Sequence, residues 1–537
     1  MRMQLLPKLL VLACLLFSSL AQAAIDPALL KPLAGDDPEA RVAAVGQLAA
    51  LATPEAARVL RALQGDTLYA TPDGNVVIVD GDGAQAYDPA TGKTAATPDG
   101  IDGVMVNNRL RGVVEGALSG LKLLAPERGE RLAAAQQLQK AVSPAQVPLI
   151  RKALAQETDP EIKPLLQVLI ASANLHAPDS AVRRQAVQDL AASSDARLLS
   201  PLQAMLDKGP DGKPGEPDEA VRIAAVDTIG QIKGRVQRTE FVGNIFYGLS
   251  LGSVLLLAAL GLAITFGLMG IINMAHGELL MIGAYTTYLC QLLFRSYLPA
   301  LQEWYLVAAL PAAFFVAGAV GVVLERTVIR WLYGRPLETL LATWGISLIL
   351  MQLVRTIFGA QNVEVANPAW MSGGVTVLGS LVLPYNRIAI IAFAMLVMVA
   401  VWLILNKTRL GLFVRAVTQN RRMADCVGVA TGKVDMLTFG LGSGIAGLGG
   451  VALSQLGNVG PDLGQSYIVD SFMVVVLGGV GQLAGTVIAA LGLGEVNKFL
   501  EPVAGAVLAK IAILVFIIIF IQKRPQGLFA MKGRSAE

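Results

Sequence analysis

The sequence predicts an all-α polytopic membrane protein: a bundle of about seven to eight transmembrane helices with a re-entrant or broken segment, preceded by an exported, mostly α-helical domain. Residues from about 241 to 522 are mostly apolar with glycine throughout, as membrane spans are, whereas residues 24–238 are charged and helix-rich. The chain also begins like a secreted protein. Its net charge is only +3 and no basic run alternates with aromatic residues, so nucleic-acid binding has no support.

The N-terminus predicts export of the residues that follow it. A basic start, an apolar run at 9–20 and the triplet Ala21-Gln22-Ala23 form a secretory signal peptide over 1–23. The alternative is an uncleaved anchor, which exports the same residues if the source is a bacterium. Cys14 leaves with the signal peptide, so no disulfide framework holds the exported domain together.

An internal repeat organises the exported domain, which is predicted over 24–238. The pattern Arg-x-x-Ala-[Val/Ala]-x-x-[Leu/Ile] follows a proline and an acidic residue, which suit a helix start, and it places one apolar stripe on a helix face. The repeats carry Arg41, Arg131, Arg183 and Arg222. Stacked helices of this kind resemble a HEAT-like solenoid. The alternative is an irregular domain of similar amphipathic helices.

Residues 65–107 depart from this helical pattern. The run Val76-Val-Ile-Val79 lies between two Asp-Gly pairs, and Pro89, Gly92 and Pro98 follow it. Short apolar runs separated by turn residues predict strands. We therefore expect a small β-hairpin insertion within the helical domain.

The membrane domain, predicted over 239–524, contains a series of apolar segments. We expect spans at about 241–265, 276–294, 305–324, 338–358, 386–405, 435–456 and 504–522, and a further apolar region at 470–499. Export of the first domain places the loops 325–337 and 406–434 in the cytoplasm. Both loops are rich in Lys and Arg, as the positive-inside rule requires. The basic tail, 525–537, should be cytoplasmic as well.

The position of the tail conflicts with a simple count of spans. If 470–499 were one ordinary span, the number of crossings would be even and the tail would lie outside. The run Leu477-Gly-Gly-Val-Gly481-Gln482-Leu-Ala-Gly485 offers a solution, because a discontinuous or re-entrant element returns the chain to the same side. Broken backbone at membrane depth is tolerated where protein or water covers it, typically along a transport route.

A polar cluster interrupts the second apolar segment. The stretch from Gly267 to Tyr285 contains Asn273, His276 and Glu278. Such groups are costly at membrane depth unless they are paired or wetted, so the trio predicts a transport pathway. The alternative is a helix–helix contact in which a neighbouring carbonyl satisfies His276. An intramembrane enzyme is disfavoured, since His276 and Glu278 fall on different helix faces, and no metal site is expected.

The order of the motifs resembles the permease subunits of branched-chain amino-acid-type ABC importers over about 240–530. Besides the polar cluster, the blocks that carry the resemblance are Glu325-Arg326 to Leu337, Leu341-Ala-Thr343-Trp-Gly345-Ile-Ser347, Thr408 to Gly428 and Val475 to Gly485. The runs Asn458-Val-Gly-Pro461-Asp-Leu-Gly464 and Gly494-Glu495-Val-Asn497-Lys498, with the exported extension, look most like the urea transporter permease. A permease for branched-chain amino acids or short amides is the alternative.

The resemblance implies a transport subunit and not an enzyme. Such a subunit pairs with a sister permease in the bacterial inner membrane, receives solute from a periplasmic solute-binding protein, contacts membrane lipid and is driven by separate cytoplasmic ATPases; no cofactor is expected. The residues expected along the solute path are Asn273, His276, Glu278, Thr343, Glu495 and Asn497. A membrane sensor with an exported ligand-binding domain is the alternative of another class. It would need a cytoplasmic output domain, whereas only loops and a short tail are expected inside.

The cytoplasmic stretch 415–428 matches the family's short helix that seats in a groove on the ATPase. The residues assigned to this contact are Arg415, Asn420, Met423, Ala424, Val427 and Gly428. Met423 and Val427 lie four positions apart and share one helix face, with Ala424 beside them. Replacing Arg421 by alanine should matter less if that residue faces solvent. The alternative, a solvated basic loop, explains the arginines but not the apolar residues.

Overall fold

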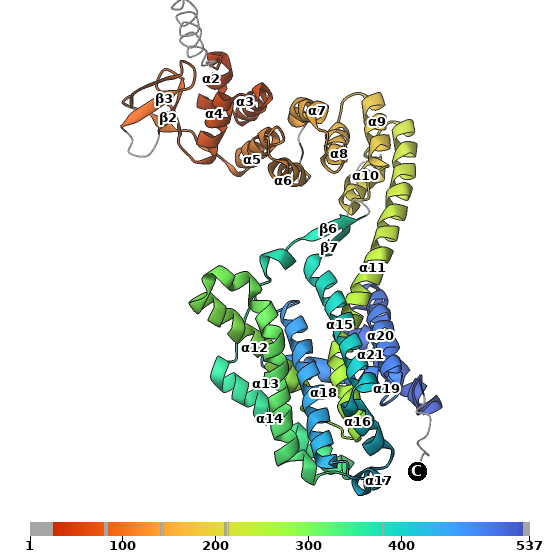
Figure 1. The fold of residues 1–537 in the computed structure, drawn as a ribbon. Helices are drawn as coiled ribbons and strands as arrows, with labels where there is room; N and C mark the ends of the chain where they lie inside the picture. Colours follow the sequence, from red (N-terminus) through yellow and green to blue (C-terminus); the bar gives the residue numbers. More distant parts are fainter. Residues whose placement is uncertain are drawn as a thin grey trace, which may run out of the picture. The chain divides into compact units, whose positions relative to one another are not determined.

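The computed structural model describes residues 25–529, apart from 80–83, 140–141, 143, 209–211, 213 and 378–380. The signal peptide predicted over 1–23 and most of the tail predicted over 525–537 lie outside the described residues. The chain forms two compact units, Met1–Gln237 and Arg238–Glu537 (Figure 1). The repeated helices and the apolar segments therefore belong to different units.

The first unit is mostly helical. Its helices are α2 (Pro27–Ala34), α3 (Pro38–Leu51), α4 (Pro54–Gln64), α5 (Asn108–Lys122), α6 (Arg128–Leu138), α7 (Val147–Gln156), α8 (Ile162–Asn174), α9 (Ser180–Leu190) and α10 (Leu199–Leu206), with 3₁₀ turns η1 (Pro144–Gln146) and η2 (Ala196–Leu198). The buried side chains that the structure describes form three successive clusters, which include Leu60, Leu166 and Leu190. Successive cores are typical of stacked helical repeats, in which each repeat packs on its neighbours.

A five-stranded antiparallel sheet is inserted between α4 and α5. Its strands are β1 (Leu68–Ala70), β2 (Val76–Val79), β3 (Gln85–Asp88), β4 (Lys93–Ala96) and β5 (Asp102–Gly103), in the order β4-β3-β2-β1-β5. The hairpins expected at 65–107 are parts of this one sheet, because β5 returns to pair with β1, with Tyr69 opposite Gly103. Val76 and Ile78 belong to the helical core, so β2 attaches the sheet to the helices.

The repeated arginine makes the same contact in three of the four repeats. Its Nη1 donates to the carbonyl oxygens six and five residues earlier, at 2.8–3.1 Å. The contacts join Arg131 to Ala125 and Pro126, Arg183 to Ala177 and Pro178, and Arg222 to Glu216 and Pro217. In the first repeat, Arg41 donates to Gly35, also six residues earlier, through Nε at 2.6 Å. The arginine therefore ties each helix to the connection that precedes it.

Two of these arginines also donate hydrogen bonds to a buried glutamate in the connection that leads to the next repeat. Arg131 donates to Glu157 at 2.8 Å, and Arg183 donates to Glu216 through two bonds of 2.8 and 2.7 Å. The hydrogen bonds from the arginines are the main reason that the pKa of each carboxyl is lowered below its ordinary value. Each pair thus links one repeat to the start of the next.

Replacing Arg183 by alanine should loosen α9 and α10. The substitution leaves Glu216, which is 3% exposed, without its guanidinium partner, at a cost of about 2 kcal/mol. Hydrogen exchange of the α9 and α10 amides in the full-length chain measures the loss. R197A is the control, because the Arg197 side chain is 58% exposed. An exposed pair of this kind contributes about 0.5 kcal/mol.

The same pair predicts a dependence on pH. Because the pKa of Glu216 is lowered in the folded protein, its stabilisation is complete above the ordinary value of 4.5 and is lost as the pH falls through the lower, folded value. Protection of the α9 amides against hydrogen exchange should decline in acid. The R183A variant should lack the part of this decline that comes from protonation of Glu216. Equal acid sensitivity in both proteins would contradict the assignment.

The second unit is a bundle of helices. They are α11 (Glu219–Met269), which begins in the first unit, α12 (His276–Tyr297), α13 (Tyr305–Thr327), α14 (Pro336–Phe358), α15 (Tyr385–Lys407), α16 (Arg409–Gln419), α17 (Arg421–Cys426), α18 (Thr431–Ser454), α19 (Leu463–Gly478), α20 (Leu483–Ala504) and α21 (Ala506–Lys523). The 3₁₀ turns are η3 (Pro299–Trp304), η4 (Ile329–Trp331) and η5 (Ala369–Met371), and strands β6 (Gly374–Val377) and β7 (Leu381–Pro384) pair between α14 and α15.

Seven helices among the described residues are long and apolar enough to cross a membrane: α11, α13, α14, α15, α18, α20 and α21. The helix expected at 276–294 forms as α12 but does not belong to this set. It packs against α13, α18 and α19 and carries buried polar residues, including Glu278, Thr287 and Gln291. Polar side chains in membrane helices face the interior of a bundle. α12 is therefore an inner helix.

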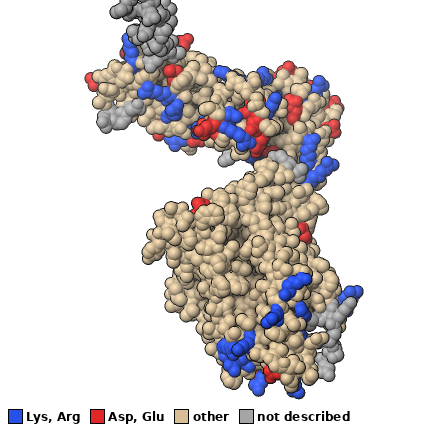
Figure 2. Space-filling model, viewed as in Figure 1, with Lys and Arg blue, Asp and Glu red and all other residues tan. Residues whose placement is uncertain are grey.

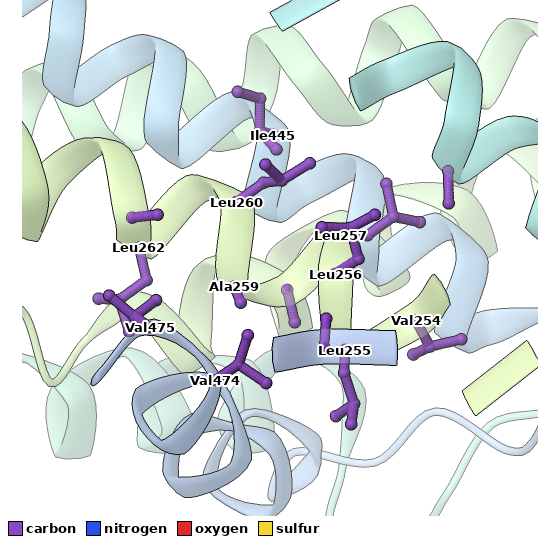
Figure 3. Close-up of a cluster of buried hydrophobic side chains, with 14 of the residues drawn as sticks. Val254, Leu255, Leu256, Leu257, Ala259, Leu260, Leu262, Ile445, Val474 and Val475 are labelled. Carbon is purple, nitrogen blue, oxygen red and sulfur yellow. The ribbon is translucent and has the colours of Figure 1, made fainter. Parts of the chain in front are cut away.

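The core of the bundle surrounds the middle of α11. Every residue from Val254 to Leu260 is at most 4% exposed, so this part of the helix is enclosed on all sides. Figure 3 shows these side chains with Ile445 of α18 and with Val474 and Val475 of α19. α11 is thus the central helix of the unit.

The two basic loops that the sequence places in the cytoplasm lie at one end of the bundle. Arg421 of α17 stacks over Tyr333, which follows η4, at 4.6 Å from the ring centroid. Arg326 also donates to Sδ of Met436 at 3.3 Å. Figure 2 shows Lys and Arg gathered toward this end, which we call the basic end. The grouping agrees with the charge pattern of the sequence.

The region expected at 470–499 is not one span. It contains the end of α19 and most of α20, and Gly479 and Gly481 between them have φ of +100° and +82°, a backbone that favours glycine. This turn lies at the basic end, because the Leu528 amide, just beyond α21, donates to the Leu477 carbonyl at 2.9 Å. α20 therefore leads away from the basic end and α21 returns to it, as a cytoplasmic tail requires.

Glycines let α18 approach its neighbours at backbone distance. A Cβ atom on Gly283 of α12 would lie 2.6 Å from Cα of Gly447 on α18, and one on Gly261 of α11 would overlap the backbone of Gly442. Close contact between small residues drives helix association inside membranes, where lipid is as apolar as the side chains. These positions therefore tolerate no side chain unless the helices separate.

The substitution Gly283→Ala should destabilise the bundle by about 1–3 kcal/mol, because backbone atoms of α18 cannot move aside as a flexible side chain would. The midpoint of thermal unfolding of the detergent-solubilised protein measures the effect. Gly492→Ala on α20 is the control, since a Cβ atom there meets no atom within 4 Å. A neutral G283A variant would show that α12 and α18 are less closely packed.

Candidate functional site

The polar cluster of the sequence forms around the start of α12. Gly270, with φ of +67°, ends α11, and a short loop leads to α12. Asn273 in this loop is fully buried, and its Oδ1 accepts from the Ala275 amide at 3.0 Å. Its Nδ2 is buried with no hydrogen-bond partner among the described residues. One amide donor of the loop is therefore left available.

Glu278 lies in the first turn of α12 and is 1% exposed. Its Oε1 accepts from Oγ of Ser347 on α14 at 2.9 Å, whereas its Oε2 is buried and has no hydrogen-bond partner within the described chain. Thr343, one turn before Ser347, accepts from the Met274 amide at 3.1 Å. The structure thus brings Asn273, Glu278 and Thr343 together. Ser347 was not among the predicted site residues, although its spacing of four from Thr343 places both on one helix face.

Two further residues extend this cluster. Tyr285, two turns after Glu278, has a buried hydroxyl with no partner in the described residues, and its ring lies 4.7 Å from that of Phe358. Asp462, just before α19, is exposed and interacts electrostatically with both Glu278 and Tyr285. Asp462 therefore adds a second negative charge to the surroundings of Glu278. We call Asn273, Glu278, Tyr285, Thr343, Ser347 and Asp462 the Glu278 cluster.

His276 is on the other side of α12. Its Nε2 lies 2.8 Å from the carbonyl oxygen of Ala258, and its ring packs where a side chain on Gly261 would be. This is the helix–helix contact that the sequence offered as the alternative for His276. The residue therefore attaches α12 to α11 and is not part of the Glu278 cluster.

Glu495 and Asn497 of α20 lie in two other places. The Glu495 side chain packs against Gly248 of α11, and its Oε2 is buried with no partner among the residues described. Asn497 lines a cavity between α11, α19, α20 and α21. The six residues predicted for one path are therefore distributed over separate regions of the bundle.

Comparison with known proteins identifies the family. Residues 244–522 match the family described as the permease component of branched-chain amino acid transport systems. The chain belongs to this family. It is the permease component of an ABC transporter of the branched-chain amino acid type, and not an enzyme.

The family match lies within the second unit, and the relatives of this permease each align with about half of the chain. It is 29% identical to the high-affinity branched-chain amino acid transport permease BraD of Pseudomonas aeruginosa over 295 residues, which are 54% of this chain and 95% of BraD. It is 32% identical to the corresponding LivH protein of Escherichia coli over 262 residues, 47% of this chain and 84% of LivH. No solved structure matches the chain.

The segment 415–428 of the permease is two helices and not the single helix that the sequence predicted. The break falls at Asn420, whose Oδ1 accepts from the Met423 amide at 3.0 Å and caps α17. Met423 and Val427 are 59% and 73% exposed, but Ala424 is 4% exposed and packs inside the permease itself. The placement of Ala424 beside the exposed apolar residues was therefore wrong.

The arginines of this segment make internal contacts. Arg421 forms an ion pair with the buried carboxylate of Asp435 and stacks over Tyr333, while its side chain remains 44% exposed to solvent. Arg415 donates to the last-turn carbonyl of Leu405 at 2.6 Å, which satisfies the end of α15. The ion pair with Asp435 could not be read from the sequence, because the partner lies fourteen residues away on α18.

Proposed function

We propose that the permease forms, with a sister permease, the membrane path for a small polar solute that carries N–H groups. A periplasmic solute-binding protein would deliver the solute, and separate cytoplasmic ATPases would drive its import across the bacterial inner membrane. The observation that carries this proposal is the Glu278 carboxylate, buried in the bundle with one oxygen that lacks a partner among the described residues. A buried charge of this kind is costly and marks a functional site.

The chemistry of the Glu278 cluster favours a solute with N–H donors. Glu278 and Asp462 supply carboxylate oxygens, Tyr285 supplies a hydroxyl, and the Asn273 amide can donate to a carbonyl or carboxylate of the solute. An ammonium group or a urea-type amide would satisfy the free oxygen of Glu278. Two negative charges that act on the same site suit a cationic ammonium group better than a neutral amide.

Two solutes meet this requirement. The relatives are named for branched-chain amino acids, which supports an amino acid as the solute of this permease. The runs at 458–464 and 494–498 and the extra first unit favour urea, which was the first choice from the sequence. Branched-chain amino acids fit the cluster at least as well, because their ammonium group pairs with carboxylates.

The basic end of the bundle is proposed to face the cytoplasm. It gathers the loops at η4 and α17 and the start of the tail, in agreement with the positive-inside rule. A signal peptide at 1–23 would then place the repeat unit in the periplasm, where its HEAT-like helices would act as a scaffold near the solute-binding protein. His276, Glu495 and Asn497 have no assigned contact with the solute in this proposal.

The ATPase is proposed to dock on α16 and α17. Leu412, Phe413, Met423 and Val427 are exposed apolar residues of this segment at the basic end. Thr418 of α16 donates to the carbonyl of Leu268 at 3.1 Å, so movement of α16 would reach the end of α11 and the loop that carries Asn273. The docking segment is thus connected to the Glu278 cluster.

The substitution Glu278→Gln should reduce uptake about tenfold or more while the permease still assembles, because an amide nitrogen replaces the carboxylate oxygen that would receive the solute. Uptake of labelled leucine and labelled urea by proteoliposomes that contain the complete importer and ATP measures this loss and identifies the solute. E338Q is the control, since the Glu338 side chain is 57% exposed at the start of α14. Unchanged uptake by E278Q would assign the cluster to helix packing.

The substitution Met423→Asp should release the ATPases, because it places a charge on the exposed apolar surface of α17. The loss expected for an unpaired charge at an interface is about 2–5 kcal/mol. Co-purification of the ATPases with the permease measures it. N406D, an added charge at an exposed position near the same end, should leave the complex intact. Normal co-purification of M423D would place the docking surface elsewhere.

A further inference from the structure

A cavity of about 260 Å³ lies between α11, α19, α20 and α21, and it shares no residue with the Glu278 cluster. Its polar lining residues are Ser466, Tyr467, Asp470, Asn497, Glu501 and Lys510. Three of these helices, α19, α20 and α21, place two acids, one lysine and one amide around a space that a small headgroup or an amino acid would fill. Such convergence of polar groups on one cavity is typical of a binding site.

The cavity is polar at one end and apolar at the other. On α19, Met473 lies about one turn beyond Asp470, and on α21, Ile513 lies about one turn beyond Lys510. Because α20 runs in the opposite direction, Leu493 lies at the same end as these two residues. A ligand that fits must therefore be polar at one end and apolar at the other.

The charged groups of the cavity retain capacity for a ligand. Nζ of Lys510 donates to Oδ2 of Asp470 at 3.0 Å, which uses one of its three donors and leaves the other carboxylate oxygen. Glu501 accepts from Lys498 at 2.5 Å through Oε2 alone. The Asn497 side chain makes no hydrogen bond to the residues that the structure describes. Two carboxylate oxygens, the lysine and an amide are thus available together.

The entrance borders a surface suited to lipid. The Lys510 side chain is 52% exposed, and Val507, Leu508 and Ile511 beside it on α21 are exposed and apolar. Lysines near the end of a membrane helix place their ammonium group at the headgroup level. A molecule in the membrane therefore reaches this cavity without crossing the bundle.

We propose that this cavity binds a zwitterionic group. The primary ammonium of the ligand would pair with Asp470 and Glu501, its phosphate or carboxylate would pair with Lys510, and its apolar part would contact Met473 and Ile513. Two sources offer this chemistry: the phosphoethanolamine headgroup of a membrane lipid, and a free amino acid. The site is independent of the proposed path, because none of its residues contacts Glu278.

Native mass spectrometry of the delipidated, full-length permease tests the lipid source. Phosphatidylethanolamine carries an ammonium with N–H donors, phosphatidylcholine carries one without them, and phosphatidylglycerol carries none. Binding of phosphatidylethanolamine should exceed that of the other two about tenfold, as charge-assisted hydrogen bonds require. Calorimetric titration with leucine, in discs of phosphatidylcholine, tests the amino-acid source.

The variants D470N and K510M identify the cavity as the site. Loss of the lipid preference in both supports a headgroup site, and loss of leucine binding in both supports an amino-acid site. K407M, which removes an exposed lysine at the end of α15, should behave as the wild type. The proposal is overturned if the wild type shows neither the lipid preference nor leucine binding. It is also overturned if D470N and K510M both retain whichever of the two the wild type shows. Failure of this proposal would leave the proposed role of Glu278 in uptake unaffected, because the cavity shares no residue with the Glu278 cluster.

Discussion

The close backbone contacts of α18 with α11, α12 and α13 are the constraint on which the second unit depends. Gly447 lies between Gly283 of α12 and Ala313 of α13, and Gly450 lies against the backbone of α12 at Leu280. In a membrane the apolar side chains gain nothing by leaving lipid for each other, so association relies on dispersion and close fit. Glycines provide that fit because they remove the side chains that would hold the helices apart.

Enclosure of α12 follows from these contacts and sets the properties of the Glu278 cluster. The first half of α12, which protein encloses, can carry Glu278 and Thr287 at membrane depth, where a lipid-facing segment could not. His276 satisfies its Nε2 on Ala258 and holds one side of α12, while Glu278 on the other side keeps one oxygen unpaired within the described chain. The helix contact made by His276 and the polar cluster around Glu278 therefore lie on opposite faces of one helix.

The first unit is held together by contacts of a different kind. Its short helices are joined by arginines that bind the carbonyls of the preceding connection, and Arg131 and Arg183 also neutralise a buried glutamate of the next. The proline, the acidic residue and the arginine of the sequence repeat thus have one physical explanation. An aspartate next to the proline caps α3, α9 and α11, and the arginine fixes the connection before the helix.

The sequence by itself determined the features that depend on composition and local order. Hydropathy located six of the seven helices that are apolar enough to cross a membrane, although the span expected at 276–294 is not among the seven. Positive charge located the loops at η4 and α17, and the glycines at 478–481 located a break, because each property is carried by neighbouring residues. Tertiary structure alone decided which polar groups meet. Ser347 reaches Glu278 across 69 residues, β5 pairs with β1, and Ala424 turns inward while Met423 stays exposed. A burial pattern or a hydrogen-bond partner is set by the segment that packs against a residue, and no local pattern specifies that segment.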